Sequence, residues 1–257
     1  MKALKKIFEE EIEREISKYP GQKKEIFTLE KIARLPEPLK KYFLSCGYVN
    51  TALMTRAEIV WKNAALCLNR NKKWMPIECY QFNSVLEPCR IVYMKTRLGG
   101  LIPFEGRDKC QDGGGNMLIK ILKIFTMVDA KGKEMAESAL CTVLAEALFL
   151  PAYSIQEYIK WTPIDELSAK ASLTFNGFSV SGIFRFNGNG EFKEFETDDR
   201  YQSADGNNLK KIRWSALCES YSFQGGIKIP ENVTALWHEE DGDYPYFRGS
   251  IKEIKFR

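Results

Sequence analysis

The first hydrophobic pattern along the chain has helical spacing. Apolar side chains recur every three or four residues from Leu4 to Tyr19, and lysine, arginine and glutamate fill most positions between them. This spacing predicts an amphipathic helix that ends before the Pro-Gly pair at 20–21. We expect its apolar face to pack on the body of the protein or on a partner chain. A second helix is predicted at 36–47, with prolines at its start and a glycine at its end.

The pattern changes to that of strands after residue 55. Three runs are rich in β-branched and aromatic residues, at 56–69, 73–84 and 89–98. The segments between them are too short for parallel crossovers, so these runs predict antiparallel strands. Beyond residue 152 the chain again has strand patterns, with a hairpin at 178–199 around an Asn-Gly-Asn-Gly turn. Further strands are expected around 212–223, 234–237 and 246–256.

Two helices are predicted between these strand regions. The clearer one occupies 134–150, where alanine, leucine and valine form one stripe and Pro151 follows. The other begins near Asn116, because four apolar residues after it lie three or four positions apart.

The order of these elements lacks the regular alternation of strand and helix that a parallel sheet needs. It predicts an α+β fold: a large curved antiparallel sheet, or half-barrel, with helices on its concave face and an N-terminal helical segment. We divide the chain into that helical segment at 1–48 and a half-barrel domain with inserted helices at 49–257.

Composition narrows the classes of function. Lys and Arg total 38 against 34 Asp and Glu and are interleaved with them, so we expect no nucleic-acid partner. No window reaches the roughly 18 apolar residues of a membrane-spanning helix, and glutamates at 9–11 interrupt any signal peptide. The seven cysteines, without a CxxC motif, predict free thiols in a reducing compartment, so a cytoplasmic protein is expected. The oligomeric state stays open.

The stretch GRDKCQDGGGNM holds the most prominent candidate for chemistry. Its glycines at 113–115 match neither a phosphate-binding loop nor a dinucleotide-binding turn, so we interpret them as a turn between a strand and a helix. A weaker alternative is an anion held by backbone N–H groups at the start of that helix. One hypothesis is that Arg107 and Asp108, beside the turn, bind and orient an anion. We favour the other, in which the two residues form an ion pair or face solvent.

Two other polar residues are candidates. Glu146 lies at the margin of the apolar stripe of the 134–150 helix. If it were half-buried there, its carboxyl group would serve as a general acid or base. We favour the alternative that this glutamate is exposed to solvent. His238 is the sole histidine, which excludes multi-histidine metal sites. The acidic residues at 239–243 lack calcium-loop spacing and predict a solvated hairpin turn. We expect neither a metal nor a cofactor.

Several fragments, in order, resemble an uncharacterised bacterial domain family: LPEPLKKYFLSCG, KWMPIECYQF, GRDKCQDGGGNM, LAEALFLP, IKWTPIDELSAKA, DDRY, GIKIPENVTALW and DYPYFRG. The likeness covers about residues 35–257 and carries no catalytic signature. The order of strands and helices is also similar, more distantly, to the lipoprotein-carrier (LolA-like) half-barrel, which implies a curved antiparallel sheet around helices and an apolar cavity. The residues that match the motifs are Trp74, Gln81, Asp108, Gly113, Gly115, Glu146, Pro151, Trp161, Arg200 and Tyr201.

The leading hypothesis is a non-enzymatic module that binds an apolar or amphiphilic small molecule on the concave, aromatic-rich side of the sheet. The alternatives are an enzyme that uses Glu146, Asp108 and Arg200 in a polar pocket, and a scaffold that binds proteins through its first helix. The candidate residues of a polar site are Arg107, Asp108, Glu146, Arg200 and Tyr201. The candidate ligand-lining residues are Trp74, Gln81, Trp161 and Trp214.

Overall fold

The computed structural model describes residues 3–21, 25–203 and 209–257. Its α-helices are α1 (Leu4–Ser17), α2 (Leu29–Ile32), α3 (Glu37–Ser45) and α4 (Lys133–Ala145), and one 3₁₀ helix, η1, spans Pro151–Ile155. The strands of the first half are β1 (Arg56–Leu66), β2 (Met75–Pro76), β3 (Glu78–Ser84), β4 (Cys89–Leu98), β5 (Ile102–Gln111), β6 (Gly114–Ile121) and β7 (Phe125–Lys131). The remaining strands are β8 (Ile159–Pro163), β9 (Ser168–Phe175), β10 (Phe178–Phe186), β11 (Phe192–Thr197), β12 (Tyr201–Ser203), β13 (Leu209–Lys211), β14 (Trp214–Cys218), β15 (Tyr221–Gln224), β16 (Ile227–Pro230), β17 (Asn232–Glu239) and β18 (Gly242–Phe256).

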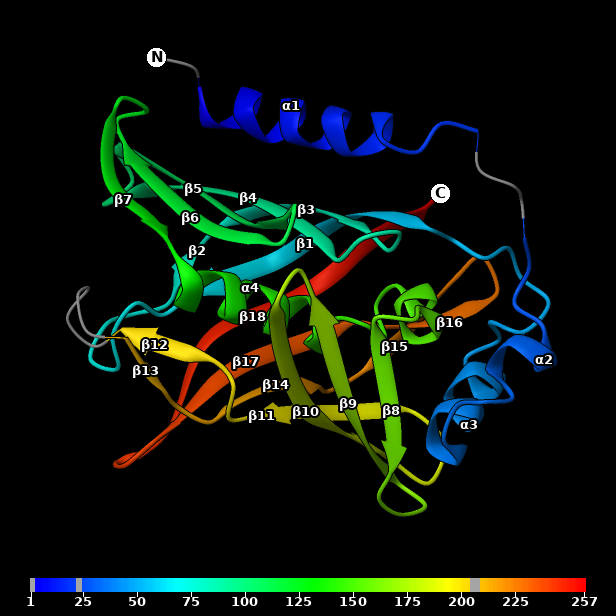
Figure 1. The fold of residues 1–257 in the computed structure, drawn as a ribbon. Helices are drawn as coiled ribbons and strands as arrows, with labels where there is room; N and C mark the ends of the chain where they lie inside the picture. The colour runs from blue at the N-terminus through cyan, green and yellow to red at the C-terminus, as the bar shows by residue number, and fades with distance from the viewer. Residues whose placement is uncertain (1–2, 22–24, 204–208) are drawn as a thin grey trace.

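One 14-stranded sheet dominates the part of the chain that the structure describes, and its strand pairs are antiparallel. Its order is β7-β6-β5-β4-β3-β1-β18-β17-β14-β11-β10-β9-β8, with β2 beside β1. The sheet curls around α4, which lies on its concave side (Figure 1). Bulges bend the central β1–β18 pair, and bulges increase the local twist of a sheet. The predicted α+β half-barrel is confirmed.

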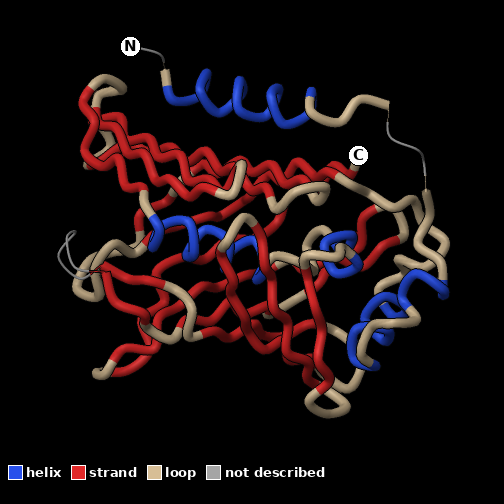
Figure 2. The backbone as a smooth tube through the Cα atoms, in the orientation of Figure 1, coloured by secondary structure: helices blue, strands red, loops and turns tan. Residues whose placement is uncertain are grey.

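The first helix covers the opposite, convex face. Figure 2 shows α1 outside the sheet and α4 within its curve. Leu4 and Phe8 of α1 are buried against Ile91 and Tyr93 of β4, and the rings of Phe8 and Tyr93 lie 5.8 Å apart. The amphipathic helix is thus confirmed, and its apolar face packs on its own sheet. This contact buries the first half of the stripe on which the scaffold hypothesis depended, whereas Ile16 stays exposed.

The segment between α1 and the sheet joins the main core. Phe27, Phe43 and Tyr48 pack in tilted and edge-to-face contacts, and Tyr42 contacts Phe186 of β10 with ring centroids 6.1 Å apart. These rings share one continuous buried cluster with the strands and α4. A division of the chain at residue 48 stays a prediction. No helix of the described residues has both the length and the apolar character needed to cross a membrane.

The glycine run is a β-hairpin turn, and the expected strand-to-helix turn is wrong. Asp112 and Gly113 have φ angles of 56° and 73°, the left-handed pair that joins β5 to β6 in a two-residue hairpin loop. A Cβ on Gly115 would lie 2.1 Å from the carbonyl oxygen of Met135 in α4. The first turn of α4 therefore crosses β6 where only glycine leaves room.

The helix expected near Asn116 is also wrong, because strands β6 and β7 occupy this region. Leu118 packs in the cluster beneath α1, whereas Met117 and Ile119 line the concave side. Because both faces of β6 are covered, apolar residues occur in sequence without the alternation of a half-exposed strand. The resulting run imitates helical spacing.

Candidate functional site

A cavity of about 290 Å³ lies between α4 and the concave face of the sheet. Strands β1 and β3–β6 supply one wall, β14, β17 and β18 supply the other, and the end of α4 closes it. Trp61, Phe149 and Trp214 are buried in its apolar interior, while Leu68 and Phe104 are more exposed and lie at its rim. This volume is near the lower end for ligand pockets, which are largely apolar with a few oriented polar groups.

A hydrogen-bonded ion network forms one side of the cavity. Arg90 of β4 donates from Nε to Glu146 Oε1 over 2.8 Å and from Nη1 to Asp108 Oδ2 over 2.7 Å. Gln81 donates to the other Glu146 oxygen over 2.6 Å and accepts from the indole N–H of Trp61 over 3.1 Å. Each oxygen of the Glu146 carboxylate therefore has a donor, so its orientation is fixed.

The two carboxylates change the properties of Arg90. Burial opposes the charge of the guanidinium, but Glu146 and Asp108 outweigh burial and raise the pKa of Arg90 above its usual value. Side-chain exposures of 13% for Arg90, 11% for Glu146 and 18% for Asp108 show that water reaches this network poorly. The arrangement neutralises and orients the carboxylates and leaves neither of them free of the arginine as a general acid or base. The expectation that Glu146 is exposed to solvent is wrong.

Arg200 supplies a second cation to the cavity, in a different environment. Its guanidinium carbon lies 4.3 Å from the ring centroid of Trp214 and 5.5 Å from that of Trp237, within the range of cation–π contacts. Its Nε and Nη1 atoms are shielded from solvent and have no hydrogen-bond partner among the described residues. The indole N–H of Trp214 is already donated to the Tyr246 hydroxyl over 3.2 Å. Arg200 therefore keeps unused donors within the cavity wall.

The structure brings five of the nine sequence-predicted residues together. These are Gln81, Asp108, Glu146, Arg200 and Trp214, all of which line the cavity. Arg107 does not line the cavity, because it precedes Asp108 by one position on β5 and successive strand residues point to opposite faces. It lies beneath α1, where it donates to the Asn116 carbonyl over 3.0 Å and pairs with Glu11. An Arg107–Asp108 clamp on one anion is thereby excluded, and so is their expected place in a turn.

The other three residues also lie outside the cavity, which corrects our expectation for them. Trp161, on the edge strand β8, packs in a tilted contact on the Phe184 ring and donates to the Ser154 carbonyl over 2.9 Å. Trp74 lies beneath Arg248, whose guanidinium carbon is 4.5 Å from its ring centroid. Tyr201 begins β12, where its backbone N–H is donated to Ser138 over 3.0 Å. All three take part in local packing or capping contacts.

Sequence reasoning missed Arg90 and Trp61. The signal for Arg90 was its place at the start of the run CRIVYMKTRL, on the same strand face as Val92 and Met94. A charged residue on the inward face of a strand needs a buried partner, and Glu146 on a distant helix is that partner. No spacing rule connects positions 90 and 146.

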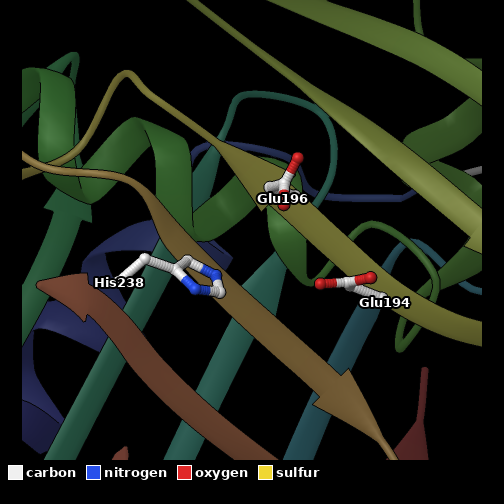
Figure 3. A group of neighbouring side chains, drawn as sticks. All are labelled: Glu194, Glu196 and His238. Carbon is white, nitrogen blue, oxygen red and sulfur yellow. The ribbon is translucent and has the colours of Figure 1, made fainter. Parts of the chain in front are cut away.

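A second polar cluster lies on the convex face. Figure 3 shows Glu194 and Glu196 on β11 with His238 on β17 close to them. The nearest ligand atoms of these three residues lie within 4.8 Å of one another, a donor set that suits a divalent transition metal. Arg185, however, pairs with both glutamates at 3.1 Å and supplies their countercharge. Nothing in the cluster requires a metal ion.

The acidic residues at 239–243 form the predicted hairpin turn, which joins β17 to β18 and has exposed residues at its tip, and His238 lies just before it in β17. Its Nε2 lies 2.9 Å from the Ser215 hydroxyl and its Nδ1 lies 2.8 Å from the Asp243 carboxylate. These are the distances of a Ser-His-Asp triad. Ser215 has no exposed surface, and its hydroxyl also lies 3.0 Å from Glu194. A substrate cannot reach this serine, so the three residues form a structural network.

Comparison with known proteins gives a family but no activity. Residues 25–249 match the model of a family described as a family of unknown function (DUF6544). No curated protein matches the chain. Among solved structures, the chain is similar to the crystal structure of the LolA superfamily protein NE2245 from Nitrosomonas europaea, with 10% sequence identity and a TM-score of 0.44. The similarity covers 85% of this chain and 93% of that chain. The family match confirms the predicted resemblance to an uncharacterised domain family, and it specifies no ligand for this protein.

Proposed function

The chain belongs to the DUF6544 family of unknown function, and from its cavity we propose that it is a non-enzymatic module that binds an apolar or amphiphilic small molecule. The observation that carries the proposal is the cavity of about 290 Å³ between α4 and the sheet, lined mainly by aromatic and aliphatic side chains. The few polar groups there include the Arg90 network, Lys95 paired with Glu78, Thr142 bonded to the Ser138 carbonyl, and Arg200 over Trp214. This is the composition of a ligand pocket in which burial supplies affinity and a few polar groups supply orientation.

The size of the cavity limits the ligand and its affinity. A volume of about 290 Å³ equals that of about ten water molecules in the liquid, so it accommodates a chain of about ten carbon atoms. Burial of about ten methylene groups at about 0.8 kcal/mol each corresponds to a gain of about 8 kcal/mol. Since association and ordering oppose this gain, we expect a Kd no tighter than about 1 µM for such a chain.

We further propose that the protein works in the cytoplasm. The seven cysteines are free and buried. Free thiols in such number are typical of proteins kept in a reducing environment.

The test is binding of 1-decanol, measured by titration calorimetry and by the fluorescence of Trp61 and Trp214, which line the cavity. Native mass spectrometry of gently purified protein is a second measurement, which detects any ligand that stays bound through purification. Saturable binding of one decanol per chain is expected. A protein that binds no decanol and carries no ligand contradicts the proposal.

An alanine-to-leucine pair distinguishes a usable cavity from a packed interior. Ala216 lines the cavity, whereas Ala171 is buried in β9 away from it. We expect Ala216→Leu to abolish decanol binding with a change in unfolding free energy below about 1 kcal/mol, because the new side chain fills existing space. Ala171→Leu should lose about 1–3 kcal/mol by overpacking and should leave binding unchanged. Equal losses of stability in the two variants would show that no usable space exists beside Ala216.

A further inference from the structure

We propose that the ligand carries a single anionic headgroup, a carboxylate, and that Arg200 binds it. This inference rests on the proposed function and specifies the chemistry of the ligand. The apolar chain would occupy the cavity between α4 and the sheet, with its carboxylate against the guanidinium that faces Trp214 and Trp237.

The first argument comes from the cations of the cavity wall. Arg90 is saturated by two carboxylates at 2.7 and 2.8 Å, and Lys95 pairs with Glu78 at 2.9 Å. Within the described parts of the chain, Arg200 is the lining cation with no carboxylate partner. The wall therefore holds one cation whose charge is not neutralised by a direct ion pair.

The second argument comes from the hydrogen-bonding capacity of Arg200. Its Nε and Nη1 have no acceptor among the described residues, although both atoms are shielded from solvent. Buried donors on a charged group are costly when they are left unsatisfied, and the cost is removed by an acceptor that arrives with a ligand. A carboxylate supplies both acceptor oxygens and the opposite charge.

The third argument comes from the geometry of the stacking. The guanidinium carbon of Arg200 lies 4.3 Å from the centroid of the Trp214 ring, so the cation is attracted to the ring by a cation–π interaction. A cation–π contact engages the charge of the guanidinium, while its Nε and Nη1 donors have no hydrogen-bond partner among the described residues. The indole thus fixes Arg200 without using its donors, as expected for a group prepared for an anion.

The test compares three ten-carbon probes at pH 7: decanoate, 1-decanol and decylamine. They share one chain and differ in headgroup charge, so their relative affinities report the headgroup site. We expect decanoate to bind at least about tenfold more tightly than 1-decanol, a difference of about 1.4 kcal/mol. Decylamine should bind more weakly than either, because its ammonium group would face Arg200.

Two substitutions locate the effect. Arg200→Gln should weaken decanoate binding at least about tenfold while 1-decanol binding stays unchanged, since the apolar contacts remain. Arg248→Gln is the matched control, because Arg248 also stacks on a tryptophan, at 4.5 Å from Trp74, but lies outside the cavity. It should leave all three affinities unchanged. Arg200→Lys keeps the charge and should retain a preference for decanoate.

The outcomes separate this inference from the proposed function. If no probe binds, both fail. If 1-decanol binds and decanoate binds no more tightly, the function stands and the anionic headgroup is refuted. The comparison of probes on the unaltered protein needs no variant, so it decides the matter even if Arg200→Gln does not fold. If decanoate is preferred but Arg200→Gln and Arg248→Gln weaken it equally, Arg200 is not the headgroup site.

Discussion

Substitution of Gly115 by alanine tests the contact on which the position of α4 depends. A Cβ there would lie 2.1 Å from the carbonyl oxygen of Met135, 2.5 Å from its carbonyl carbon and 2.7 Å from the nitrogen of Ala136. All three are backbone atoms of the first turn of α4, so no side-chain rotation relieves the clash. The helix must move about 1 Å from β6 to reach the 3.0 Å that real Cβ contacts keep. Such a shift also displaces Glu146 at the far end of the helix, where it meets Arg90.

We expect the Gly115→Ala change to lower the free energy of unfolding by about 3 kcal/mol, at the upper end of the range for overpacking. For a chain of this size the corresponding fall in Tm is about 6–12 °C. Urea denaturation followed by far-ultraviolet circular dichroism measures the first quantity, and a thermal scan measures the second.

Gly114 provides the matched control. It precedes Gly115 on β6, neither residue has positive φ, and a Cβ on Gly114 meets nothing closer than 3.6 Å. Gly114→Ala should therefore be neutral or should stabilise slightly, because alanine lowers the entropy of the unfolded chain. If the two variants differ by less than about 0.5 kcal/mol, the close approach of α4 to β6 is refuted.

Two further predictions concern buried charges and thiols. Arg90→Leu should lower the free energy of unfolding by about 3–5 kcal/mol, because Glu146 and Asp108 lose their cation. Adding Glu146→Gln and Asp108→Asn should restore most of the loss in urea titrations, and failure to do so contradicts the ion network. Burial raises the pKa of Cys141 to about 11 and that of Cys79 to about 12, so the folded protein keeps protons that the unfolded chain loses above pH 9. Stability should therefore fall from pH 9 to 11, by up to about 1.4 kcal/mol per pH unit for each thiol, and a constant urea midpoint over this range would oppose the assignment.

The candidate site was only partly predictable from the sequence. Glu146, Asp108 and Arg200 were candidates for a polar site from the sequence, although Asp108 was expected beside a turn, and all three line the cavity. The sequence did not predict that Arg90 would bind both Glu146 and Asp108. Because the arginine pairs with both carboxylates, neither is free to act as a general acid or base. Trp74 was expected on the aromatic-rich concave side of the sheet, but it precedes β2 and contacts Arg248 outside the cavity.

Local chemistry determined most of the elements of this protein. The helical stripe at 134–150, the Asn-Gly hairpin at 187–190 and the β-branched runs after residue 55 each indicate their structure over a few residues, where short-range sterics and periodicity act. The absence of helices between successive strands was sufficient to give an antiparallel sheet.

The tertiary structure decided which faces are covered, and with them the site. Strand β6 is apolar on both sides because α1 covers one face and the cavity lies on the other, which no local pattern distinguishes from a helix. The requirement for glycine at position 115 comes from the close approach of α4. The buried position of Arg90 depends on Glu146, which lies 56 positions further along the chain. Such pairings depend on how distant segments meet when the sheet curls. Burial and electrostatics act through space, whereas sequence patterns report only the nearest neighbours along the chain.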